Sequence, residues 1–179
     1  MLPKLSPGFA RACRQRDKGR HGKIVEGAGM RILLLLLLST VALAAPPAVS
    51  KDGRFTMAIP EEYQTLNNPN PSSMLNLLCP TAKALVVVVR AKPEKKTPAQ
   101  LIKIMPNEVP WKISSSKLGK VGNRQAAIFQ ASEVMQEYPN FKTVVGIVPA
   151  SKGLYIFQIH YSQGEPAVYE KWLSGVTWK

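Results

Sequence analysis

The sequence predicts an α+β fold with a central antiparallel β-sheet and at least two packed helices, and three observations support it. Residues 84–89, ALVVVV, are apolar and mostly β-branched, which is typical of a strand buried on both faces. Between residues 111 and 161, β-rich stretches are separated by short turns, as in an antiparallel meander. Thr97-Pro98 and Glu165-Pro166 each precede apolar residues at helical spacing, and proline favours the first turn of a helix.

The N-terminal 44 residues are expected to lie outside the folded domain. Residues 30–44 read as a signal peptide, because Arg31 precedes a 12-residue apolar run that ends in small residues. That run is shorter than the roughly 20 residues that a membrane-spanning helix needs. Residues 1–29 form a basic extension, and a start codon assigned too early is preferred over an organelle transit peptide as its interpretation. The protein is therefore expected to be exported, to a periplasm or out of the cell, with no transmembrane segment in the mature chain.

The remaining chain has the length of a single domain. Residues 45–179 keep +7 of the formal net charge of +13, so the basic excess is moderate. Residues 45–52 are a polar leader, and residues 53–179 are expected to form one α+β domain.

The first half of this domain contains three candidate strands. Residues 55–59 alternate apolar side chains and end at Pro60, and residues 61–73 form a loop by their Asn, Pro and Ser content. A second apolar stretch covers residues 74–79, and the third strand is the run at 84–89. That run is expected at the centre of a sheet that is covered on both sides.

The second half begins with a short helix. Thr97 is its expected N-cap, Leu101, Ile102 and Met105 form its apolar stripe, and Pro106 is expected to close it. The remaining expected elements are a strand and turn within 111–122, strands at 124–135, 142–148 and 154–161, and a helix from Pro166 to Gly175 that packs through Val168 and Trp172.

Four short stretches in this order carry a family resemblance: PEEY at 60–63, TPAQL at 97–101, GNRQA at 122–126 and WLSGVTW at 172–178. Together with the order of elements, they resemble the PsbP-like superfamily, which includes DcrB-type periplasmic proteins. The resemblance covers residues 53–178. It implies a central antiparallel sheet with helices on both faces, an α/β/α sandwich, and a mostly non-catalytic role in binding or assembling partners.

Residues that carry catalysis are scarce. Residues 45–179 contain one histidine, His160, one cysteine, Cys79, and one aspartate, Asp52, and no nucleotide-binding or zinc-protease motif. No catalytic, cofactor-binding or metal-binding residue is predicted. His160 is expected at the exposed or half-exposed end of a strand, and Cys79 as a small buried side chain, with an intermolecular disulfide as the alternative.

Two basic groups are candidate contacts for an anionic partner. The first contains Arg90, Lys92, Lys95 and Lys96, and the second contains Lys112, Lys117, Lys120 and Arg124. Each is either a solvated surface or a contact for a phospholipid surface, a cell-wall polymer or an acidic protein. Nucleic acid is not expected, because aromatic residues do not interleave with these groups.

The sequence thus predicts an exported, non-enzymatic binding or assembly factor at the cell envelope, whose partner is an envelope protein or an anionic surface and whose candidate patch is the first group. The alternative is a small exported hydrolase that uses His160 with Cys79 or a serine.

Overall fold

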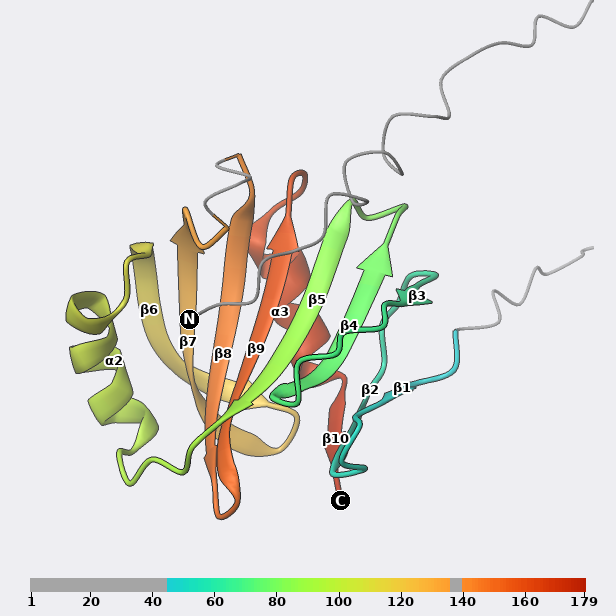
Figure 1. Ribbon diagram of the computed structural model, residues 1–179. Coiled ribbons are helices and arrows are strands. Elements are labelled where there is room, and N and C mark those ends of the chain that lie inside the picture. Colours follow the sequence, from blue (N-terminus) through green and yellow to red (C-terminus); the bar gives the residue numbers. More distant parts are fainter. Residues whose placement is uncertain (1–44, 136–139) are drawn as a thin grey trace, which may run out of the picture. The chain divides into compact units, whose positions relative to one another are not determined.

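In the computed structural model, residues 45–135 and 140–179 are described, and most of their strands belong to one seven-stranded antiparallel sheet (Figure 1). The expected extension at 1–29 and signal peptide at 30–44 lie outside the described residues. The elements are β1 (Ala48–Val49), β2 (Phe55–Met57), β3 (Gln64–Thr65), β4 (Ser73–Cys79), β5 (Ala84–Ala91), α2 (Pro98–Glu108), β6 (Lys112–Val121), β7 (Arg124–Ser132), β8 (Lys142–Ala150), β9 (Gly153–Tyr161), α3 (Pro166–Ser174) and β10 (Val176–Trp178).

The large sheet has the strand order β3-β4-β5-β9-β8-β7-β6. Its last four strands in sequence are antiparallel neighbours, and short turns join β6 to β7 and β8 to β9, so the predicted meander is confirmed. Strand β9 also pairs with β5 along its whole length, from Ala84 opposite Tyr161 to Ala91 opposite Leu154. This pairing joins the meander to β5, β4 and β3.

The apolar run in β5 lies inside the sheet, but its two faces are covered unequally. Val86 and Val88 are fully buried, whereas Val87 and Val89 are only half-buried. The expectation that this strand is covered on both sides is therefore wrong for its second half. Hydrophobicity reports what a strand can bury, and the neighbouring elements decide what it does bury.

One face of the large sheet packs against α3 and a small second sheet. The small sheet has the order β1-β2-β10, so it joins segments from near the two ends of the described chain. Phe55 and Met57 of β2, together with Trp172 and Leu173 of α3, belong to the same buried cluster as the inward side chains of β5 and β9. The sequence did not indicate this small sheet, because β1 and β10 have only two and three residues.

Helix α2 packs against the other face, over β6 and β7 and reaching β8. Leu101 and Met105 lie in one cluster with Phe129 and Val145, as the expected stripe requires. The helix ends at Glu108 rather than at Pro106. A proline removes one backbone hydrogen bond. The last turn nevertheless continues past Pro106, where the backbone N–H of Val109 donates to the backbone oxygen of Met105 and Val109 packs against the same cluster.

Helix α3 ends at Gly175 as expected, but it presents a different face to the core. Tyr169, Trp172 and Leu173 are buried, whereas Val168 is 51% exposed. Val168 and Trp172 are spaced so that they could share one helical face. The face that is buried instead contains Tyr169, Trp172 and Leu173. Neither α2 nor α3 is long and apolar enough to cross a membrane, and these are the helices of the described residues.

Candidate functional site

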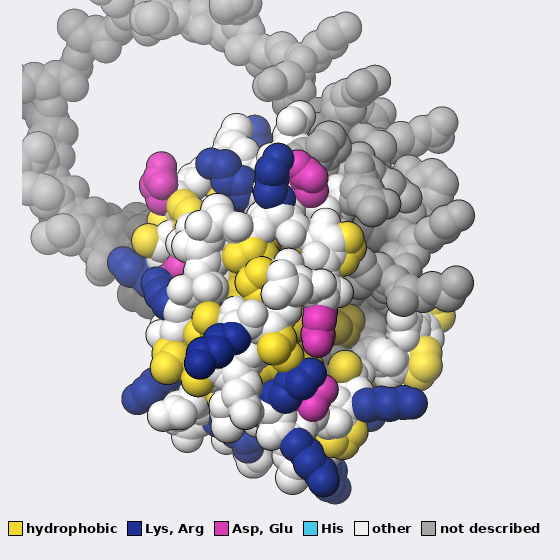
Figure 2. Space-filling model, turned by 90° about the vertical axis from the view of Figure 1, so that its left-hand side faces the viewer, with side chains coloured by type: hydrophobic (Ala, Val, Ile, Leu, Met, Phe, Trp, Pro, Cys, Tyr) yellow, Lys and Arg dark blue, Asp and Glu magenta, His cyan; other side chains and the backbone are white. Residues whose placement is uncertain are grey.

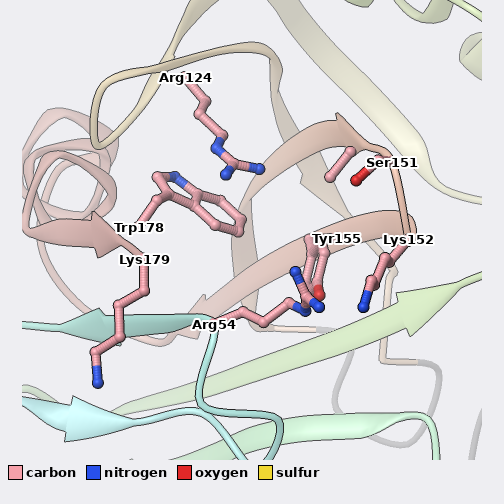
Figure 3. A pocket seen from close by; sticks show the side chains of 8 residues that line it. Arg54, Arg124, Ser151, Lys152, Tyr155, Trp178 and Lys179 are labelled. Atoms are coloured by element: carbon pink, nitrogen blue, oxygen red, sulfur yellow. The ribbon is translucent and has the colours of Figure 1, made fainter.

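A small basic pocket lies at the end of the large sheet where β5 ends and β9 begins. It has a volume of about 30 Å³, and one water needs roughly 10–15 Å³. Four of its lining side chains are cationic: Arg54, Arg124, Lys152 and Lys179. Ser151, Tyr155 and Trp178 also line the pocket (Figure 3). The pocket can therefore hold one small group and strongly favours a negative one.

Trp178 is the fixed centre of the pocket wall. Its ring packs among Phe55, Tyr155 and Phe157, with ring centroids 5.4, 5.3 and 5.8 Å away. Its Nε1 donates a hydrogen bond of 2.8 Å to the backbone oxygen of Val121, at the end of β6. Aromatic clusters of this kind hold their members in one orientation, so the exposed edge of Trp178 is a rigid surface.

The two arginines of the pocket come from segments that are far apart in the sequence. The guanidinium carbon of Arg124, at the start of β7, lies 4.3 Å from the centroid of the Trp178 ring. This cation–π contact orients the planar guanidinium. Arg54 precedes β2, and its backbone oxygen accepts a hydrogen bond from the backbone N–H of Lys179. Figure 3 shows Arg54 and Lys152 reaching toward Tyr155, while the amine of Lys179 points away.

Asp52 lies beside the pocket, and its hydrogen-bonding capacity is already used. Its Oδ1 accepts from Ser50 Oγ and the Arg54 backbone N–H, at 2.9 and 3.2 Å. Its Oδ2 accepts from Arg90 Nη1 and Tyr155 Oη, at 3.1 and 2.8 Å. Burial alone would raise the pKa of Asp52, but the bonds from Tyr155, Ser50 and Arg54 and the charge of Arg90 lower it overall. Asp52 is therefore a carboxylate that neutralises Arg90.

The pocket cations have no acidic partner among the described residues. Among residues 45–135 and 140–179, no carboxylate lies within ion-pair distance of Arg54, Arg124, Lys152 or Lys179. Acidic partners bind other cations instead, such as Glu170 with Lys117 at 2.6 Å and Glu133 with Lys112 at 3.3 Å. Other described cations, such as Lys83 and Lys142, also lack an ion pair, but Arg54, Arg124 and Lys152 line one small pocket.

The predicted patch of Arg90, Lys92, Lys95 and Lys96 is partly neutralised. Arg90 binds Asp52, and Lys96 lies 3.8 Å from Glu94 and 3.7 Å from Glu108. Lys92 and Lys95 are exposed. On the face of the molecule that carries α2 and β6, basic side chains are spread out, with acidic ones between them (Figure 2). Whether Lys92 and Lys95 contact a partner stays a prediction.

The second predicted group divides between surface ion pairs and the pocket. Lys112 and Lys117 hold the pairs described above, and Arg124 lines the pocket. Arg124 is therefore the one residue of the two predicted groups that lies in the pocket wall.

His160 is buried, so its expected place at an exposed strand end is wrong. It is 3% exposed, and its Nδ1 lies 2.9 Å from Thr143 Oγ1 on β8. Burial lowers its pKa to about 4. Strand β9 is flanked by β5 and β8 up to its last residue, and this pairing was not visible from the strand alone.

Cys79 is fully buried, as expected, and burial raises its pKa to about 12. It belongs to the cluster beneath α3, whereas His160 alternates with Ile159 and Tyr161 and points to the opposite face. The sheet therefore separates the two side chains, and they cannot form a nucleophile–base pair in this fold. A hydrolase that pairs His160 with a serine stays a prediction. In the described part of the chain, no three His, Cys, Asp or Glu side chains gather as a metal site.

Sequence reasoning missed most of this pocket, because its residues come from four separate turns and ends. One signal was available in the sequence. TWK at 177–179 and GNR at 122–124 contain a tryptophan and cations that do not belong to the alternating apolar pattern of a strand. That signal becomes specific only when the fold brings the segments together.

Comparisons with known proteins bear on the fold. No protein-family model matches the chain, and no curated protein matches its sequence. A crystal structure from Bacteroides thetaiotaomicron matches with a TM-score of 0.53 and 12% identity, over 76% of this chain and 49% of that one. This chain thus spans about half the length of the Bacteroides protein.

The solution structure of cyanobacterial PsbP (CyanoP) from Synechocystis matches with the same TM-score of 0.53, at 6% identity, over 75% of this chain and 92% of that one. At these identities the likeness concerns the fold alone. The chain has an α+β fold that resembles PsbP, as the sequence predicted.

Proposed function

We propose that this domain is a non-enzymatic binding or assembly factor of the cell envelope, which holds an anionic group of its partner in the basic pocket. The observation that supports this proposal most directly is the arrangement of Arg54, Arg124 and Lys152 around one small pocket, where no described carboxylate lies within ion-pair distance of them. Like charges that lie together without partners raise the energy of the free protein, and an anion that binds among them relieves that repulsion.

The proposal includes export through residues 30–44, to a periplasm or out of the cell. It also includes a three-layer α/β/α arrangement, with α2 and α3 on opposite sides of the large sheet. The separation of Cys79 from His160 by that sheet favours binding over a cysteine-dependent hydrolase.

The test is recovery of the tagged full-length protein with the envelope fraction of its own cell. In the double variant Arg54→Glu/Lys152→Glu, two attractive contacts become repulsive. Exposed contacts contribute about 0.2–1 kcal/mol each, so retention should fall at least about fivefold. It should also fall for the wild type in 1 M salt, where the screening length is about 3 Å.

The matched control is Lys83→Glu/Lys142→Glu, which makes the same charge change on exposed residues at the other end of the sheet. Retention of this control should equal that of the wild type. Equal losses in the two double variants would assign retention to net charge and refute the role of the pocket.

A further inference from the structure

We propose that the pocket recognises a phosphate group, either free or as part of a lipid headgroup. This inference rests on the proposed function, because it names the ligand of the same pocket. Three properties of the site support it: the amount of unneutralised charge, the number of directions from which donors approach, and the rigidity of the wall.

The charge of the pocket exceeds what a single carboxylate would neutralise. Asp52, which Tyr155 of the pocket wall contacts, already accepts four hydrogen bonds and pairs with Arg90. Arg54, Arg124 and Lys152 therefore remain available to a ligand. A phosphate monoester carries a charge of about −1.5 to −2 at pH 7, and a carboxylate carries −1. Three cations are better matched by the phosphate.

The donors reach the pocket from separate elements. Arg54 comes from the turn before β2, Arg124 from the start of β7, and Lys152 with Ser151 from the turn between β8 and β9. Figure 3 shows these side chains around the pocket rather than along one wall. A tetrahedral group with three free oxygens can accept from several directions, whereas both oxygens of a carboxylate lie in one plane.

The side chain of Arg124 and the backbone at Arg54 are held before any ligand arrives. Arg124 stacks on Trp178, whose Nε1 is bound to Val121. Arg54 follows a turn in which Ser50 and Asp52 tie the backbone of Arg54 and Phe55. Such ordering lowers the entropy lost on binding. The volume of about 30 Å³ has room for two or three waters at roughly 10–15 Å³ each, so the rest of a larger ligand must remain outside the pocket.

The first experiment is calorimetric titration of the full chain with inorganic phosphate, glycerol phosphate and acetate at equal ionic strength. Both phosphates should bind at least about tenfold more tightly than acetate, because each charge-assisted contact that acetate cannot make is worth about that factor. Equal affinities for acetate and both phosphates would overturn the proposal.

The second experiment separates the two sources of phosphate, using vesicles of phosphatidylcholine with and without phosphatidic acid. Binding to phosphatidic acid that glycerol phosphate displaces supports the lipid headgroup. If the soluble phosphates bind and the vesicles do not reduce that binding, free phosphate is supported as the ligand. Binding to vesicles that neither glycerol phosphate nor pocket substitution reduces would overturn the proposal.

Variants connect the binding to the pocket. Arg54→Gln and Lys152→Gln should each weaken phosphate binding about tenfold, while Lys83→Gln should leave it unchanged. Lys152 is exposed in a turn, so its substitution should keep the fold even if Arg54→Gln does not. Equal affinity in all three would refute the site. If the pocket variants are no longer retained on the envelope fraction but the wild type binds no phosphate, the proposed function stands and phosphate is not the ligand. If the wild type binds phosphate but is not retained on the envelope fraction, the phosphate site stands and the proposed envelope function is refuted.

Discussion

The buried imidazole of His160 lies between neutral neighbours on both adjoining strands. Leu85 of β5 is opposite it on one side, and Thr143 of β8 is opposite it on the other and contacts its Nδ1. Burial therefore acts on its pKa without an opposing charge, and lowers it from 6.5 to about 4. At neutral pH the side chain is uncharged and serves the packing of the sheet.

This burial predicts a loss of stability in acid. Between pH 6.5 and about 4 the unfolded chain binds a proton at His160 and the folded chain does not, so the free energy of unfolding should decrease as the pH falls through this window. The shift corresponds to about 3 kcal/mol in total. Urea unfolding at pH 7, 5.5 and 4 measures it.

The conservative variant His160→Gln removes the titrating group and keeps a polar side chain of similar size. Its free energy of unfolding should vary less with pH over the same window than that of the wild type. Parallel curves for the two proteins would show that His160 does not cause the pH dependence.

At the same scale, the sequence predicted the burial of Cys79 correctly and that of His160 incorrectly. Alternation along a strand assigns each side chain to a face, and both assignments were right. Cys79 shares its face with Leu75 and Leu77, so its own strand already indicated a core. His160 shares its face with Gln158, and only the pairing with β5 and β8 reveals that both are buried.

At the scale of elements, the turn between β6 and β7 is locked against the junction of α3 and β10. Gly122 has φ +59, and its N–H donates a hydrogen bond of 2.8 Å to the backbone oxygen of Leu173. A Cβ at this position would lie 2.0 Å from the backbone oxygen of Val176. The turn therefore requires glycine for its conformation and also for the space beside it.

Substitution of Gly122 should show both requirements. Gly53→Ala is the matched control, because Gly53 has φ +66 and nothing within 4 Å of an added Cβ. The control should lose about 1–2 kcal/mol for the left-handed conformation alone. Gly122→Ala should lose at least about twice as much, since backbone atoms must also move. Chemical unfolding measures both, and equal losses would contradict the close contact.

Strands with regular alternation and clear ends were predictable, whereas pairings between distant segments were not. Residues 142–148 and 154–161 match β8 and β9 closely, because period-two alternation and turn residues are local signals. The small sheet depends on β10 meeting β2 across almost the whole domain, which no local pattern encodes. The pocket was missed for the same reason.

At the scale of the whole molecule, both ends of the large sheet carry cations, and those at one end surround the pocket. The strand register places Arg90 of β5, Arg124 of β7 and the turn that carries Lys152 at the same end (Figure 1). Glu133 follows β7 at the opposite end. Lys92 and Lys95 follow β5 in the segment that leads to α2, and neither lines the pocket.

The patch is tested separately by reversing Lys92, Lys95 and Lys96 to Glu. If these side chains contact an anionic surface, retention on anionic vesicles should decrease, and the melting temperature should not change. Exposed ion pairs such as Lys96 with Glu108 contribute little to stability. Retention that is unchanged by the triple variant and by 1 M salt would assign the patch to solvation.

The small β1-β2-β10 sheet gives the pocket an order of assembly. Arg54 and Trp178 lie in segments that meet only when β10 pairs with β2, so the pocket cannot exist before this long chain closure is complete. An anion that binds there stabilises, by mass action, the form in which β10 is paired with β2, relative to forms in which β10 has detached. The ligand would thus stabilise the pairing of β10 with β2. Only the fully folded domain would bind it.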